Sequence, residues 1–443
     1  MFNRLFLDVY NQLHNAFRAV IPEPTKRIPI TWRNYPNTLA FLIPLIFMAY
    51  LVRRPNTYLI RLFLLPTLIA MTLYACFGYM WTRPSFNVYN WAQGLVALTF
   101  VGKGLEYAFT PQGRWKIGES KLGQEETPAV ALKDKPPPHS NGFANGSVEV
   151  DLPRAEKQFD SVLPKWFLDS VEVLLAMRGI GWDFGRGVHI PREPRPLEQA
   201  PYLKATLVSA LRHFITLDFF ESCLKLVPGV GSVSGGTIFL PTLPPLYRYT
   251  VSTAIHIATG TAFIAGFGMV YDIITLIAVG LFGHKLSSWP PVFDNPWVSE
   301  SLHEYWAKRW HQLLRQTFLV YGGYPGLLIG GKFGLVIGTF LASGFYHECA
   351  AYAMGRPWEW RPIIFFLLQG CCIILERVWR QVTGRRVGGW AGTAWVYFCI
   401  MVLGQICVDS WHSRGLAGGM VIPPLVSPTR QIVFPIALYI TGR

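Results

Sequence analysis

Long apolar segments recur along this chain of 443 residues and restrict its possible folds more than any other feature. A segment of about 20 mostly apolar residues is long enough to cross the hydrocarbon core of a bilayer as a helix. Charged residues make up only 15% of the sequence, whereas soluble domains carry about 25%. Strands with the ten-residue alternation of an outer-membrane barrel are lacking. The pattern therefore predicts an all-α, polytopic transmembrane bundle.

We expect about eight or nine spans from the length and spacing of these segments. Residues 251–283 are long enough for one long tilted span or two short ones, and residues 205–227 are either interfacial or packed inside the bundle. The first thirty residues mix charge with apolar positions at helical spacing, which predicts an interfacial helix or a short anchor rather than a removed signal. Further candidate spans are 37–52, 59–81, 88–109, 317–345, 362–379, 390–408 and 431–441.

A polar segment at residues 110–165 divides the chain. It is rich in Pro and Gly and poor in apolar clusters, which is typical of a solvent-exposed, partly disordered loop. It separates N-terminal membrane segments at residues 1–109 from a larger core at residues 166–443. The sequon Asn145-Gly146-Ser147 lies in this loop, and we interpret it as an unused cytosolic match.

The formal net charge is +14. With membrane-length apolar runs in the same chain, a positive-inside bias is the simplest cause, and a role in binding an anionic substrate remains open. We expect no nucleic-acid partner. The 7 cysteines form no CxxC pair, so neither a disulfide framework nor a zinc ribbon is indicated.

The segment "GKFGLVIGTFLASGFYHECAAYAMG" at residues 331–355 carries both small and ionisable residues. Gly334, Gly338 and Ala342 recur every four residues and share a helix face, which favours the close approach of another helix. Ser343 and His347 form a neighbouring stripe.

Glu348 points about 100° away from His347 around the helix, so the two side chains need not touch. An ionisable residue in such a segment is a functional candidate, because an unpaired one costs several kcal/mol. The alternative is a histidine that is hydrogen-bonded at the membrane edge and fixes the bundle. Position alone does not separate these interpretations.

A second polar cluster lies in residues 289–318, "WPPVFDNPWVSESLHEYWAKRWHQLLRQTF". Ser301 and Glu304 form a capping-box pattern that predicts a helix start. We expect one basic amphipathic helix at the membrane surface. Its apolar side would carry Leu302, Trp306, Trp310 and Leu313, and its polar side Glu304, Lys308, His311 and Arg315. The flanking cations could hold phosphates near His311, and the next helix delivers His347.

The sequence motifs do not indicate a histidine metal site, a serine hydrolase or a nucleotide-binding loop. No two of the 10 histidines lie closer than eight residues, so the clustered ligands of a membrane di-iron oxidase are absent, and we expect no metal. No GxSxG nucleophile elbow and no Walker A sequence are present. The pair His347 and His311 is therefore the leading catalytic candidate.

These segments resemble the membrane-bound O-acyltransferases, in particular the wax-synthase-like branch. The resemblance rests on Arg309-Trp310-His311 and on Phe340-Leu341-Ala342-Ser343-Gly344-Phe345-Tyr346-His347. The segments "RGIGWDF" (178–184) and "WPPVF" (289–293) are similar to accessory signatures of the fungal members.

The resemblance implies that acyl-CoA, as a co-substrate rather than a permanent cofactor, donates an acyl group to a lipophilic alcohol. It assigns His347 as the catalytic base and His311 as a second polar residue, although many relatives carry Asn at that position. It favours acetyl transfer to a terpenoid or meroterpenoid secondary metabolite, with a long-chain wax or sterol ester synthase as the alternative. Candidates for substrate or CoA binding are Ser343, Lys308, Arg309, Trp310, Arg315 and Glu348, with Arg356 as a further cation.

A different class, a membrane transporter in which His347 and Glu348 form a proton relay, is the competing hypothesis. The lack of internal repeats argues against it. For the enzyme we expect a multi-pass protein of the endoplasmic reticulum membrane, with the cationic segment facing cytosolic CoA. Instead of binding CoA phosphates, each of the candidate cations could extend its charged group to the bilayer surface.

Overall fold

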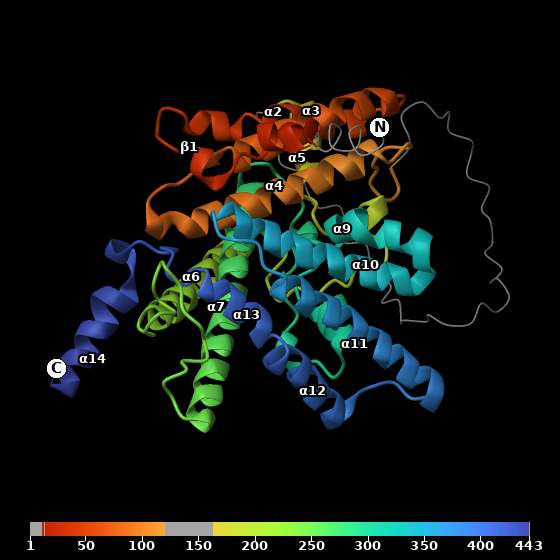
Figure 1. Cartoon of the computed structure of the whole chain (residues 1–443). Helices are drawn as coiled ribbons and strands as arrows, with labels where there is room; N and C mark the ends of the chain where they lie inside the picture. Colours follow the sequence, from red (N-terminus) through yellow and green to blue (C-terminus); the bar gives the residue numbers. More distant parts are fainter. Residues whose placement is uncertain (1–10, 13, 120–162, 443) are drawn as a thin grey trace, which may run out of the picture.

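The computed structural model describes residues 11–12, 14–119 and 163–442, and in these ranges nearly all regular structure is helical (Figure 1). The α-helices are α2 (Leu42–Val52), α3 (Tyr58–Phe77), α4 (Asn87–Ala108), α5 (Lys165–Leu175), α6 (Gln199–Lys225), α7 (Pro245–Gly280), α8 (Leu302–Glu304), α9 (Arg315–Phe318), α10 (Tyr324–Ala353), α11 (Arg361–Thr383), α12 (Gly389–Tyr397), α13 (Gln405–Ser413) and α14 (Phe434–Thr441). Strands β1 (Ile28–Pro29) and β2 (Tyr79–Met80) pair in parallel. The predicted all-α class is confirmed.

Shorter helical turns complete the described elements. The π-helical turns are η7 (Tyr305–Arg309), η8 (Leu319–Gly323), η9 (Phe398–Val402) and η11 (Thr429–Val433). The 3-10 turns are η1 (Pro24–Lys26), η2 (Tyr35–Leu39), η3 (Pro84–Phe86), η4 (Asp183–Gly185), η5 (Leu286–Ser288), η6 (Pro296–Val298) and η10 (Pro424–Val426). In Figure 1, α2, α3 and α5 lie at the top of the view above α4, and α14 projects at the lower left.

Six helical segments of the described ranges are long and apolar enough to cross a membrane, fewer than the eight or nine expected. They are Tyr35–Val52, Tyr58–Phe77, Pro245–Gly280, Arg315–Ala353, Arg361–Thr383 and Gly389–Ser413. The expected span at residues 88–109 becomes α4, which buries the ion pair Lys103–Glu106 and is not among the six. The expected span at residues 431–441 becomes the short helix α14. Residues 251–283 fall largely within α7, which is one continuous helix of 36 residues.

Several expectations fall partly or wholly outside the described residues. Residues 120–162, which hold most of the expected loop and the sequon at Asn145, are among them, as are residues 1–10 of the expected N-terminal interfacial helix. Residues 14–20 are helical and mostly exposed.

The predicted single amphipathic helix in residues 301–318 is wrong, because the chain bends in the middle. Ser301 accepts a hydrogen bond from the Glu304 backbone N–H at 3.1 Å, so the predicted helix start is confirmed. The helix then widens into η7 and ends at Trp310, whose backbone is extended (φ −72°, ψ 153°). Gln312 stabilises the bend by donating to the carbonyl oxygens of Trp306 and Trp310 at 2.8 and 2.9 Å.

The segment from α9 through α10 is a helical hairpin rather than one long span. Its backbone leaves helical geometry at Gly330 and Gly331, and Gly331 has a positive φ of 57° that a side chain would strain. A Cβ at Gly338 would fall on the carbonyl oxygen of Gly322. Gly326 and Gly334 make the same backbone contact one turn closer to the reversal. The predicted close approach at the small-residue face is confirmed, and the partner helix is the preceding arm of the same hairpin.

A buried ion pair ties α10 to α13. Arg414 donates both terminal nitrogens to Glu348, at 2.7 and 2.9 Å, and the two side chains are 4% and 0% exposed. The same carboxylate accepts from the backbone N–H of Glu359 at 2.8 Å. Arg361 then pairs with Glu359 and with Asp409. These contacts join the ends of α10, α11 and α13 into one unit, which is called the ion-pair group below.

We predict that Gly338→Ala lowers the thermal unfolding temperature in detergent, because the added methyl group meets backbone that cannot move aside. Overpacking of this kind costs about 1–3 kcal/mol. Gly266→Ala on α7 is the matched control, since its Cβ would meet only Leu217 at ordinary contact distance. Equal unfolding temperatures for the two variants would contradict the hairpin packing.

We also predict that Glu348→Gln destabilises the protein by about 3–5 kcal/mol, because Arg414 is left as an uncompensated buried charge. Glu23→Gln serves as the control, since its ion pair with Lys26 is largely exposed and such pairs contribute less than about 1 kcal/mol. Thermal unfolding in detergent measures both. Similar losses of stability in the two variants would show that the buried pair contributes no more than the exposed one.

Candidate active site

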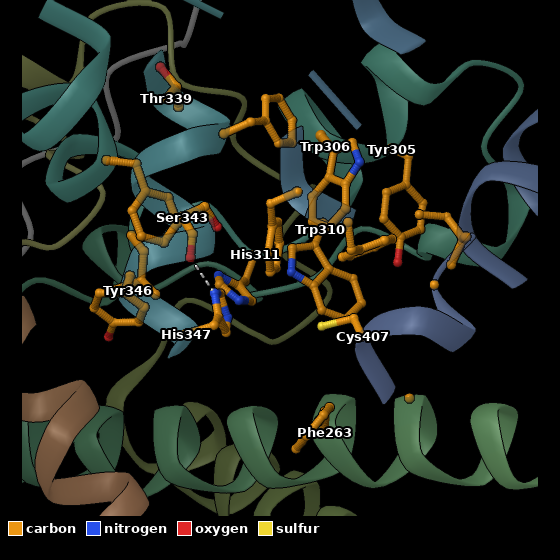
Figure 2. Close-up of a pocket in the computed structure, with 18 of the residues that line it drawn as sticks. Phe263, Tyr305, Trp306, Trp310, His311, Thr339, Ser343, Tyr346, His347 and Cys407 are labelled. Carbon is orange, nitrogen blue, oxygen red and sulfur yellow. Dashed lines mark hydrogen bonds between the residues drawn. The ribbon is translucent and has the colours of Figure 1, made fainter. Parts of the chain in front are cut away.

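A cavity of about 420 Å³ lies between α7, the segment 303–319, α10, α11 and the segment from η9 to α13 (Figure 2). Aromatic rings form much of its wall and contact one another; Phe263 stands edge-on to Trp411 with ring centroids 5.4 Å apart. A largely apolar pocket with a few polar side chains is the usual form of a small-molecule site. The aromatic lining residues include Trp91, Phe263, Phe267, Trp306, Trp310, Phe318, Phe340, Phe366 and Trp411.

His347 on α10 lines this cavity, and its backbone neighbour selects its tautomer. The Nδ1 atom lies 2.7 Å from the carbonyl oxygen of Ser343, one turn earlier (Figure 2). A carbonyl oxygen only accepts hydrogen bonds, so Nδ1 carries the proton and donates it. In the neutral imidazole, Nε2 then has a free lone pair and can act as a base.

Two rings on other helices hold the His347 imidazole in place. Phe366 of α11 is stacked on it, with centroids 4.5 Å and planes 18° apart. Trp411 of α13 contacts it with centroids 5.8 Å apart. Both helices are joined to α10 by the ion-pair group, so the orientation of this imidazole also depends on contacts outside the cavity.

His311 lines the same cavity because of the bend after Trp310. Its ring packs on Phe267 of α7 with centroids 4.9 Å apart and on Phe293 at 5.8 Å. Burial lowers the pKa of His311 to about 3, and positive charge on His347 or Arg178 acts in the same direction. His311 is therefore a neutral imidazole at physiological pH.

The two accessory signatures of the sequence meet behind His311. Arg178, from "RGIGWDF", donates to the backbone carbonyl oxygen of Pro291 at 2.8 Å and also contacts that of Pro290 and the hydroxyl of Tyr271. Both prolines belong to "WPPVF", whose Phe293 packs against His311. The two segments thus form one support for the second histidine.

The structure brings some of the predicted binding residues to the cavity and leaves others away from it. Ser343, Trp310 and Arg315 line it. For Ser343, the backbone carbonyl rather than the hydroxyl makes the contact with His347.

Lys308, Arg309 and Glu348 do not line the cavity. Arg309 is held by the Glu304 carboxylate at 2.8 Å, and Glu348 is held by Arg414. The further cation Arg356 donates to the backbone of Val233. Glu348 is therefore not positioned as a substrate ligand, because both its oxygens are occupied inside the protein.

Two basic residues that sequence reasoning missed, the histidine His303 and the cation Arg377, line the cavity as well. Burial lowers the pKa of His303, and the positive charges of Arg377, Lys308 and Arg386 lower it further. One part of the cavity wall is therefore surrounded by cations from α8, η7 and the end of α11. The basic residues near 377–386 gave a signal in the sequence, but nothing there placed them beside residues 303–308.

His256 on α7 is a third missed residue. It lines the cavity at 7% exposure, and the Nδ1 atom is buried with no hydrogen-bond partner among the described residues. His256 lies within an apolar span and belongs to no recognisable motif. The only signal in the sequence was that a polar side chain in such a span is energetically costly.

Comparison with known proteins gives a family for this site. Residues 289–368 match the model of the membrane bound O-acyl transferase family. The matched range contains His311, Ser343 and His347, together with the bend and the hairpin that bring them to the cavity.

Three relatives carry the comparison further. An O-mevalon transferase of Penicillium terrestre is 25% identical over 252 residues, which are 51% of this chain and 56% of that protein. An acetyltransferase of Calcarisporium arbuscula is 27% identical over 171 residues, 36% of this chain and 40% of its own. An acyl-CoA–sterol O-acyltransferase of Arabidopsis thaliana is 30% identical over 105 residues, 21% of this chain and 30% of its own.

The chain thus matches about half, or less, of the length of these relatives. No solved structure matches it. Over residues 289–368, which hold both histidines, the chain is thus similar to the membrane-bound O-acyltransferases, and its six long apolar helices agree with that similarity.

Proposed function

We propose that this protein transfers an acyl group, and acetyl first of all, from acyl-CoA to a hydroxyl group of a lipophilic terpenoid or meroterpenoid alcohol. The observation that carries the proposal is the orientation of His347, whose Nδ1–H bond to the Ser343 carbonyl leaves Nε2 as a base in an aromatic cavity. The relatives named as an acetyltransferase and an O-mevalon transferase support acyl transfer.

The proposed reaction is a direct acyl transfer. Nε2 of His347 takes the proton of the alcohol as its oxygen attacks the thioester carbonyl carbon. The tetrahedral intermediate then collapses, the carbon–sulfur bond breaks, and the proton passes from the imidazolium to the departing CoA thiolate. The products are the ester and free CoA, and His347 returns to its neutral tautomer.

His311 supplies the second polar group of this mechanism. As a neutral imidazole it can donate one hydrogen bond, and we assign this bond to the oxyanion that develops on the thioester carbonyl. Asn offers an N–H donor in the same role, which explains why both residue types would serve. The aromatic wall keeps water from the thioester and so suppresses hydrolysis.

The cationic part of the cavity wall suits the phosphates of CoA. His303 and Arg377 line the cavity there, and Lys308 and Arg386 act on His303 from nearby. Phosphates are favoured by such clustered positive charge. Since CoA is cytosolic, we place this end of the protein toward the cytosol and the protein in the endoplasmic reticulum membrane.

Acetyl transfer to a large alcohol and long-chain transfer to a sterol or fatty alcohol are distinguished by the donor. The test uses purified protein with labelled acetyl-CoA or palmitoyl-CoA and a panel of terpenoid, sterol and fatty alcohols. Ester formation from acetyl-CoA supports the proposal, and ester formation from palmitoyl-CoA alone would replace it with the long-chain alternative. Failure of every pair, with ion flux or solute uptake in proteoliposomes, would favour a transporter.

We predict that His347→Ala lowers kcat for ester formation by about 100-fold to 10,000-fold, the range expected for loss of a general base. The unfolding temperature should stay close to that of the wild type, so that the lost rate does not result from unfolding. His14→Ala is the control, because His14 is exposed and does not line the cavity. Wild-type activity in His347→Ala would overturn the proposed mechanism.

The pKa of His311 predicts a pH dependence of stability. The group binds a proton near pH 3 in the folded protein but near 6.5 when unfolded, so unfolding takes up a proton between these values. Its contribution to stability is complete above pH 6.5 and falls by about 2 kcal/mol on lowering the pH to 5. Unfolding temperatures at pH 7 and pH 5 should therefore differ more for the wild type than for His311→Asn. Equal differences would show that His311 is not buried as a neutral group.

A further inference from the structure

The cavity continues along α7 beyond the two catalytic histidines. Phe267 packs on the ring of His311, whereas His256 lines the cavity eleven residues earlier on the same helix. Eleven residues correspond to about 16 Å along a helix axis. The catalytic pair therefore lies at one end of this face of α7, and His256 lies at the other.

The packing of α7 on α13 gives a second measure of this separation. Phe263 contacts Trp411, which in turn contacts His347. Seven residues earlier on both helices, the ring of His256 lies 2.7 Å from the position that a Cβ on Gly404 would occupy. Two turns on either helix amount to about 10 Å, so both helices place His256 about this far from the residues around His347.

His256 is a buried polar side chain for which the described part of the chain offers no hydrogen-bond partner. Its Nδ1 is unpaired, and no hydrogen bond joins its ring to another described residue. A buried polar group left unpaired costs about 1–3 kcal/mol. Such a group in a cavity wall therefore calls for a ligand that satisfies it.

The polar neighbours of His256 are already occupied. Thr259 donates to the carbonyl oxygen of Ile255 at 2.8 Å and pairs with His412 at 2.8 Å. Ser252 pairs with Gln405 at 2.9 Å. Ser252 and Thr259 are thus satisfied within the protein. The Nδ1 atom of His412 is also unpaired, but His412 does not line the cavity, whereas His256 does.

The space beside His256 suits a rigid hydrocarbon. Gly260 follows it by one helical turn on the same cavity-lining face, and a Cβ there would meet nothing within 4 Å. Ile257, which follows His256 directly, and Met401, which lies three residues before Gly404, also line the cavity. His256 therefore has open space and apolar lining residues beside it.

We propose that His256 recognises a second oxygen substituent of the acyl acceptor, held roughly 10 Å from the hydroxyl group that His347 deprotonates. The acceptor class is a rigid, mostly hydrocarbon molecule with oxygen at both ends, such as a hydroxyketone of polycyclic terpenoid or steroid size. This inference rests on the proposed function, because it names the acceptor of the same site. His256 would determine acceptor specificity and take no part in the bond-breaking steps.

The experiment compares androsterone, which has a hydroxyl group at one end and a ketone at the other, with androstanol, which lacks the ketone. The measured quantity is the ratio of their kcat/KM values with acetyl-CoA. We expect wild type to favour androsterone about ten-fold, as one buried hydrogen bond allows, and His256→Leu to bring the ratio near one. His256→Gln, which keeps a hydrogen-bonding group, should restore part of the preference.

A purely structural role of His256 would lower both kcat/KM values alike and leave their ratio unchanged, which would overturn the inference. Gly260→Phe is the contrasting variant, because its ring fills the open space and should lower transfer to both steroids equally.

A binding measurement keeps this test independent of catalysis. Androsterone should raise the unfolding temperature of the wild type more than androstanol does, and His256→Leu should remove the difference. Equal shifts, or no shift, in the wild type would overturn the inference. If the selective shift appears but no ester forms from any acyl-CoA, the proposed function fails while the binding role of His256 stands.

Discussion

The ion pair between Glu348 and Arg414 sets the geometry on which the site depends. Glu348 directly follows His347, and about 100° of helical rotation separates the two side chains. One therefore faces the protein interior and pairs with Arg414, while the other faces the cavity. The carboxylate anchors the end of α10, and the anchored helix presents the imidazole between Phe366 and Trp411.

The site is assembled from segments that each depend on a specific local departure from regular helix. The bend at Trp310 turns His311 toward Phe267. The reversal at Gly330 and Gly331 lets the two arms of the hairpin meet backbone to backbone. These irregularities are what bring two histidines from neighbouring elements to one cavity, which a continuous helix through the region would not do.

The features that could be predicted were those with local causes. Apolar length predicted the helical membrane bundle, the four-residue spacing of Gly334, Gly338 and Ala342 predicted a close helix contact, and Ser301 predicted a helix start. The motif pattern also singled out both His347 and His311. Each of these depends on residues that are neighbours along the chain or along one helix.

What could not be predicted depends on distant partners. The bend after η7 depends on Gln312 reaching back to two carbonyl groups, and amphipathic periodicity alone continues through it. The sequence indicated that Arg309 could bind phosphate, but in the structure its side chain forms an ion pair with Glu304. His256 has no motif around it, and its meaning comes only from the absence of partners among the described residues and from its place in a cavity wall.

The hydrogen bond from His347 to the Ser343 carbonyl has a consequence for how such a protein can diversify. Because the acceptor is main chain, substitution at position 343 does not by itself remove the group that fixes the tautomer. The tautomer of His347 therefore does not depend on which side chain stands at position 343. Wall positions such as Gly260 and Met401 can therefore change in size and polarity without altering the proton position on His347.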